Sequence, residues 1–205
     1  MKHYSITIAP ALTPSEWFFH VRNMRDEVYQ AGYNMIDEHD CDEKSRLSIL
    51  SMPEISKLEG IISNESKVID KTEFRRIIEA YLQKQGNKIT IEDMSFDDSS
   101  KETVLPKKAG KISKHYSIVI EPALSAAEWF FHVRSLAEHV AESGYYLDDF
   151  RDGYILDRQS VLTGQAHAVF EGFVSSDTPI ATKTIENHVI NYLSTHRLTL
   201  VEMSL

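Results

Sequence analysis

The chain has 205 residues, of which 42% are hydrophobic and 26% are charged, a composition typical of a folded globular protein. Its 31 acidic and 22 basic residues give a formal charge of −9, which argues against general binding to nucleic-acid phosphates or anionic lipid. The single Cys41 excludes an intramolecular disulfide and any multi-thiolate metal site. The sequence contains no glycine-rich phosphate loop, zinc motif or dinucleotide fingerprint, so we expect neither a metal nor a cofactor. No apolar run reaches the roughly 18 to 20 residues that span a bilayer, and we expect a cytoplasmic protein without membrane contact.

An internal duplication organises the sequence. Residues 2–22 and 114–134 are identical at 16 of 21 positions, at a constant offset of 112. The same offset continues with lower identity to about residue 66, and the copies realign at their ends, residues 89–96 and 198–205. Self-similarity at a fixed offset is the signature of a repeated structural unit.

The segment between the copies is polar, contains Pro106 and Gly110 and shows no apolar periodicity, which is typical of a linker. The sequence therefore predicts a first repeat over residues 1–96, a linker over 97–113 and a second repeat over 114–205.

The beginning of each repeat predicts a strand followed by a helix. Tyr4, Ile6 and Ile8 alternate with polar residues, as expected for a strand with one apolar face. The helix begins at the capping box of residues 13–16 and ends before Gly32. Residues 125–128 and Gly144 repeat these signals in the second copy.

The rest of each repeat predicts two strands, a helix and a final strand. We expect the second strands at residues 46–50 and 158–162, and the third at 58–63 and 170–175, with a bulge at Gly60 and Gly172. A helix capped at Asp70 and a closing strand follow. This order is that of the ferredoxin-like fold, so the sequence predicts an α+β protein in which a ferredoxin-like domain is duplicated in tandem, each with two helices on one face of an antiparallel sheet.

Helical geometry places aromatic residues on the outer side of the first helix. At about 100° per residue, Trp17 faces the predicted core, whereas Phe19 lies roughly opposite to it. Phe131 occupies the same place in the second repeat. A large aromatic side chain on an exposed face is typical of a contact with another domain, subunit or protein, so we predict an interface at Phe19 and Phe131.

Polar residues of the same helix extend this candidate interface. Glu16 and His20 lie one turn apart, at a spacing that allows a hydrogen bond. The arginine two residues further on is expected to pair with a carboxylate or with an anionic partner. The polar interface candidates are His20 and Arg22 in the first repeat, and His132 and Arg134 in the second.

The first strand of each repeat carries a His-x-Ser pattern on the face away from the predicted helices, as His3-Tyr4-Ser5 and His115-Tyr116-Ser117. One such pattern in each of two related lobes resembles the two-histidine phosphoesterase family. The resemblance implies a metal-independent phosphodiesterase that acts on a cyclic nucleotide or an RNA end. In such an enzyme His3 and His115 would exchange protons with the substrate, and Ser5 and Ser117 would hold phosphate oxygens.

The chain departs from that family before each histidine, where Lys2 and Lys114 replace the usual apolar residue. Composition and duplication favour a different hypothesis, a non-enzymatic interaction or regulatory protein whose two domains bind, and inhibit, a basic protein partner or associate with themselves. Direct binding to nucleic acid is not expected. Small-molecule sensing at a cleft between the repeats is a further alternative.

Overall fold

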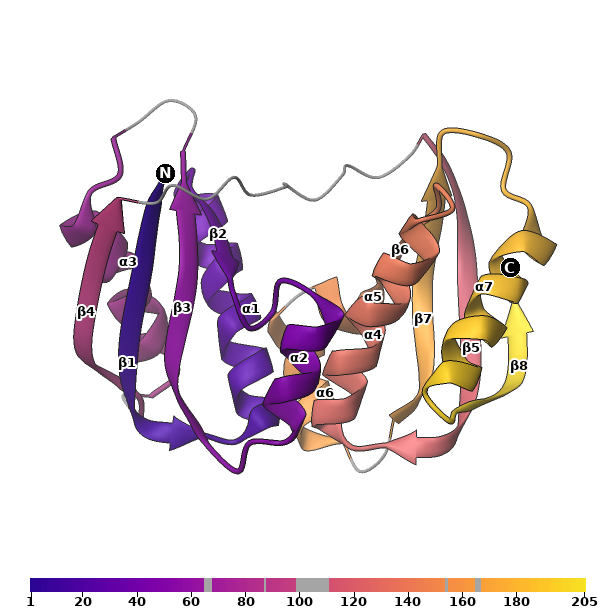
Figure 1. Cartoon of the computed structure of the whole chain (residues 1–205), viewed down its shortest axis with the longest axis horizontal. Coiled ribbons are helices and arrows are strands. Elements are labelled where there is room, and N and C mark those ends of the chain that lie inside the picture. The colour runs from indigo at the N-terminus through magenta and orange to yellow at the C-terminus, as the bar shows by residue number, and fades with distance from the viewer. Residues whose placement is uncertain (65–67, 87, 99–110, 154, 165–166) are drawn as a thin grey trace. The chain divides into compact units, whose positions relative to one another are not determined.

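The computed structural model describes residues 1–64, 68–86, 88–98, 111–153, 155–164 and 167–205. The chain forms two compact units, Met1–Leu105 and Pro106–Leu205. Each unit contains one four-stranded sheet, and the described residues form seven helices in all, so the protein is a mixed α+β protein (Figure 1). Strand residues occupy both ends of the predicted linker, residues 97–113, and residues 99–110 of it lie outside the described ranges.

The first unit is built from four strands and three helices. In chain order these are β1 (Lys2–Leu12), α1 (Pro14–Gln30), β2 (Asn34–Asp37), α2 (Glu43–Leu50), β3 (Ile55–Ser63), α3 (Lys71–Lys84) and β4 (Thr90–Asp98). The strands lie in the order β2-β3-β1-β4, and every neighbouring pair is antiparallel.

The second unit repeats this arrangement with one additional short helix. Its elements are β5 (Ile112–Leu124), α4 (Ala126–Ala141), β6 (Tyr146–Asp149), α5 (Phe150–Gly153), α6 (Ile155–Thr163), β7 (His167–Ser176), α7 (Thr182–Thr195) and β8 (Thr199–Ser204). The strand order is β6-β7-β5-β8, again antiparallel throughout.

The start and end of the first helix are confirmed in both units. Thr13 caps α1 and Ser125 caps α4, and each forms the full reciprocal box with the glutamate three residues later. Gly32 and Gly144 follow these helices with φ of +89° and +85°, values that a side chain disfavours. The capping signals were local and complete, so the sequence alone located these boundaries.

The predicted second strands at residues 46–50 and 158–162 are wrong, because both segments are helical. Asp42 caps α2 by accepting a hydrogen bond from the Ser45 amide at 2.8 Å. The buried residues Arg46 and Ile49 are three apart, the spacing of a helix face, and a short apolar run does not distinguish a helix from a strand. The second strand of the sheet is instead the four-residue β2, and β6 in the second unit.

The core of each unit lies between the sheet and its helices. Tyr4, Ile6 and Ile8 point from β1 into this core, and the Tyr4 ring lies 5.6 Å from that of Phe74 on α3. Figure 1 shows the two long helices of each unit on one side of its sheet. The alternate strand residues point away from the helices and form what we call the outer face of the sheet.

Gly60 allows β2 and β3 to approach closely. A Cβ atom on Gly60 would collide with the carbonyl oxygen of Ile36, and one on Gly172 with that of Asp148. The predicted bulge at these glycines is wrong, because the pairing of β1 with β3 continues without a shift through Gly60, and that of β5 with β7 through Gly172. The glycines are needed for backbone contact between neighbouring strands.

Candidate functional site

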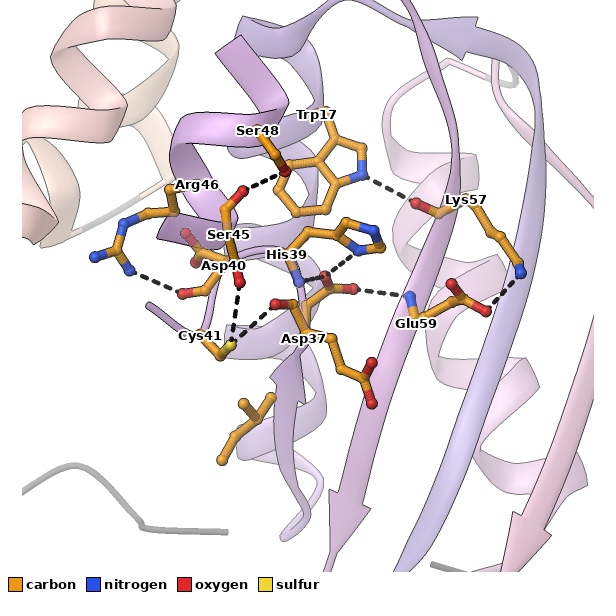
Figure 2. A network of polar contacts seen from close by, with 12 residues as sticks. Trp17, Asp37, His39, Asp40, Cys41, Ser45, Arg46, Ser48, Lys57 and Glu59 are labelled. Carbon is orange, nitrogen blue, oxygen red and sulfur yellow. Dashed lines mark hydrogen bonds and ion pairs between the residues drawn. The ribbon is translucent and has the colours of Figure 1, made fainter. Parts of the chain in front are cut away.

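A buried carboxylate ends the second strand of the first unit. Asp37, 5% exposed, accepts a hydrogen bond from the Tyr4 hydroxyl at 3.1 Å. It also accepts from the backbone amides of His39 at 2.9 Å and Glu59 at 3.1 Å (Figure 2). Burial raises its pKa, and burial beside Asp37 also raises the pKa of Tyr4. The imidazole of His39 lies 3.3 Å from the same carboxylate, which raises the histidine pKa.

The second unit holds the same arrangement at an offset of 112. Asp149 accepts hydrogen bonds from Tyr116 at 3.4 Å and from the backbone amides of Arg151 and Glu171, both at 2.8 Å. Burial raises the pKa of Asp149 to about 7. In both units protein groups saturate a carboxylate that has almost no exposed surface, so the arrangement fixes β2 and β6 in place and offers no atom to a substrate.

A second repeated network joins the first helix to the segment after β2. Arg22 lies 3.6 Å from Asp40, and Arg46 donates to the Asp40 carbonyl at 3.0 Å. In the second unit Arg134 pairs with Asp152 at 3.2 Å, and Arg158 donates to the Asp152 carbonyl at 2.8 Å. The carboxylate partners expected for Arg22 and Arg134 are therefore present, inside each unit.

The predicted exposure of Phe19 and Phe131 is wrong. These side chains are 2% and 1% exposed, and Arg22 is fully buried. The ring of Phe131 lies 5.9 Å from that of His196, which follows α7, so a further element lies beside this side of the helix. A helical wheel assumes that one face of a helix is covered, and it fails where neighbours flank the helix on more than one side. An interface role for these residues stays a prediction, and its premise of exposure is lost.

The predicted hydrogen bond between Glu16 and His20 is replaced by two separate interactions. Glu16 accepts from Thr13 in the capping box, and His20 shares a 2.7 Å hydrogen bond with the Tyr81 hydroxyl of α3. His132 and Tyr192 repeat the second contact at 2.8 Å. Burial lowers the pKa of both histidines to about 4, so each is neutral at pH 7.

The His-x-Ser residues lie on the outer faces, as expected from their alternation. His3 lies 3.3 Å from a carboxylate oxygen of Glu38, and His115 lies 3.2 Å from one of Glu171. Ser5 donates to Glu59 at 3.4 Å, and Ser117 lies opposite Glu171 in the sheet register. Each histidine thus has an acidic neighbour within its own unit.

The outer face of the second sheet is strongly acidic. Residues opposite one another in antiparallel strands point to the same face, so the register identifies its members. Its carboxylates are Glu121, Asp148, Glu171 and Glu202. Among the described strand residues, this face carries neither Lys nor Arg. Among its described strand residues, the outer face of the first sheet carries Glu59, Asp93 and Asp97 with one lysine, Lys57, which pairs with Glu59.

Three rings form a cluster on the outer face of the second unit. His115 on β5, Phe173 on β7 and Phe150 at the start of α5 lie with ring centroids 5.2 to 6.1 Å apart. Phe150 is 42% exposed and Phe173 is 47% exposed. Sequence reasoning missed this cluster, because its three members come from separate elements and no local pattern joins them.

Three further histidines of the second unit are half-buried and lie together. His139, His188 and His196 gather around Tyr192, between α4 and α7. His39 also makes specific contacts, with Asp37 and with the ring of Trp17. His167 lies where the side chains are not described.

Within the described ranges, no group of three or more His, Cys, Asp or Glu side chains could hold a metal ion. No helix in the described part of the chain is both long and apolar enough to cross a membrane. A comparison with protein-family models found no model that matches the chain, and a comparison with curated protein sequences found no match either. The geometry of the two outer faces is therefore the basis for a functional argument.

Proposed function

We propose that the chain is a non-enzymatic binding protein made of two ferredoxin-like repeats, and that the outer faces of its sheets hold a protein partner with a basic surface. The observation that carries this proposal is the charge of the second outer face. It presents four carboxylates and, among the described strand residues, neither Lys nor Arg.

The strand order supports the ferredoxin-like part of the proposal. The order β2-β3-β1-β4, with two long helices on one face, is the one expected for that fold when each repeat carries an added helical segment between its second and third strands. The tandem duplication is supported by the buried networks, since Tyr4, Asp37 and Asp40 have counterparts with the same contacts at an offset of 112.

The chemistry of the outer face selects the class of partner. Carboxylates on a partly solvated surface attract Lys and Arg side chains and repel phosphates, so charge complementarity gives both a faster encounter and a choice of partner. Desolvation raises the pKa of Asp148 above its usual value, and a nearby cation would favour its charged form. A partner that uses a basic surface to bind phosphates would be inhibited while this protein covers that surface.

The alternative reaction, hydrolysis of a phosphodiester at His3, Ser5, His115 and Ser117, is less well supported. Its substrate is an anion, and it would have to approach a face on which Glu171 already contacts His115 at 3.2 Å. Small-molecule sensing stays an untested alternative.

The test compares two variants of equal net charge. The face variant carries Asp148→Asn, Glu171→Gln and Glu202→Gln, and the control variant carries Glu138→Gln, Glu142→Gln and Asp157→Asn on the helical side of the same unit. Binding of a nona-arginine peptide is measured by calorimetry at about 150 mM salt, where long-range attraction is screened. We expect the face variant to bind about tenfold more weakly and the control variant to bind like the wild type. Equal weakening of both variants would refute the proposal.

A further inference from the structure

The ring cluster on the second outer face has carboxylates on two sides. Phe173 lies in one cross-strand row between Asp148 on β6 and His115 on β5. Glu171 is two residues earlier on the same strand and face, and it contacts His115 at 3.2 Å. Phe150 closes the cluster, with its ring 5.2 Å from that of Phe173 at an interplanar angle of 82°. The result is two exposed phenyl rings, nearly perpendicular, beside two carboxylates.

The equivalent positions of the first unit lack this combination. Glu38 stands in place of Phe150 and pairs with His3 at 3.3 Å. Ile61 stands in place of Phe173 and is 7% exposed, against 47% for the phenyl ring. The two faces therefore share a histidine and an acidic character, and only the second has exposed aromatic rings.

We infer that Phe150, Phe173, Asp148 and Glu171 form a subsite for an arginine side chain of the basic partner. This inference rests on the proposed function and adds the side chain that its second face recognises. A guanidinium group is planar, so it stacks on a phenyl ring and is attracted by the negative face of the ring. Its five N–H donors point outward in the plane of the guanidinium, where the carboxylates of Asp148 and Glu171 can accept them.

The same surroundings disfavour the other common occupant of exposed rings on a sheet. Nucleic-acid bases stack on such rings in single-strand binding proteins, where basic side chains hold the phosphates. Here the flanking groups are carboxylates, and the described strand residues of this face include no Lys or Arg. A lysine ammonium would also be attracted, but it cannot stack as a plane or donate two parallel hydrogen bonds.

The test replaces the rings by apolar side chains that are not aromatic and leaves the charge of the protein unchanged. In the variant Phe150→Leu/Phe173→Leu, the affinity for nona-arginine should fall about tenfold, since each exposed ring contributes two- to fivefold. The affinity for nona-lysine should fall less, so the preference for arginine over lysine should shrink. The matched variant Phe150→Tyr/Phe173→Tyr keeps both ring faces and should bind nona-arginine like the wild type.

Three results would overturn the inference. The first is an unchanged preference for arginine over lysine in the leucine variant. The proposed function would survive that result if the face variant, whose carboxylates are neutralised, still bound nona-arginine more weakly. The second is binding of an oligo-dT strand that the leucine variant loses, which would make the rings a platform for bases. The third is a concentration-dependent dimer in sedimentation velocity that the leucine variant dissolves, which would make the occupant a second copy of this chain.

Discussion

The interiors of the two units match closely, whereas their outer faces differ. The contacts of Asp37 and Asp40 recur at Asp149 and Asp152 with nearly the same distances. On the outer faces, an acidic residue and a shielded isoleucine of the first unit correspond to exposed phenylalanines in the second. A buried polar group without its partner is costly, so the interior of a repeat tolerates little change, while an exposed position is free to acquire a new contact.

The largest effect is expected from the buried ion pairs of the interior. Asp40→Ala leaves the fully buried Arg22 without this carboxylate and should lower the unfolding free energy of the first unit by about 3 to 5 kcal/mol. Asp152→Ala should cost less, because the Arg134 and Asp152 side chains are 12% and 19% exposed. Each unit has one tryptophan, so urea unfolding in Trp129→Phe and Trp17→Phe backgrounds reports the units separately. If Asp40→Ala and Asp152→Ala lowered the unfolding free energy of their units equally, this expectation would be wrong.

A second test uses the pH dependence of stability. The folded-state pKa values of His20 and His132 are about 4, below the unfolded value near 6.5. The neutral rings therefore stabilise the fold fully above pH 6.5, and this contribution is lost as the pH falls from 6.5 to 4, by up to about 3 kcal/mol per histidine. His20→Asn and His132→Asn should each flatten the unfolding free energy against pH for their own unit. If both variants kept the wild-type slope of unfolding free energy against pH, groups other than these histidines would cause the pH dependence.

The close strand contact provides a matched pair of smaller effects. Gly60→Ala and Gly172→Ala each force a methyl group against a carbonyl of the neighbouring strand and should cost about 1 to 3 kcal/mol. Gly153→Ala is the control, because nothing lies within 4 Å of a Cβ atom there, and it should change stability by less than about 0.5 kcal/mol. Thermal or urea unfolding measures all three, and a neutral Gly60→Ala would disprove the close approach.

The smallest stability effect is expected on the second outer face. Phe150→Leu and Phe173→Leu should each change the unfolding free energy by less than about 1 kcal/mol, because both rings are partly exposed. The control Phe170→Leu alters a side chain that is 1% exposed, and it should cost more. If Phe150→Leu and Phe173→Leu destabilise the unit as much as Phe170→Leu does, the two rings stabilise the fold and are not kept for binding.

Local signals in the sequence predicted much of the fold. The capping box at Thr13, the stop at Gly32 and the alternation of Tyr4, Ile6 and Ile8 depend on neighbouring residues alone, and all are confirmed. The segment at residues 46–50 was misjudged because its buried Arg46 reads as polar, although the side chain bonds to the Asp40 carbonyl inside the unit. A local sequence pattern does not reveal that a charged side chain is buried beside a hydrogen-bonding partner in the core.

The candidate site was less predictable for the same reason. The strand alternation correctly placed His3 and His115 on the outer faces, but the partners that define their surroundings come from other strands and helices. Phe150 and Phe173 are 23 residues apart in the sequence, and their rings meet because α5 begins directly after β6, which pairs with β7. The helical wheel misplaced Phe19 because it does not include elements that flank the helix.

The proposal that the second outer face binds a basic partner is tested most directly by locating the site at which a basic peptide binds. Isotope-labelled protein is titrated with nona-arginine at about 150 mM salt while its backbone amide resonances are followed by NMR. We expect the shifted resonances to cluster on β5, β6 and β7 around Phe173, and the face variant to lose these shifts. Shifts confined to the helical side of the unit, or shifts that persist unchanged in the face variant, would contradict it.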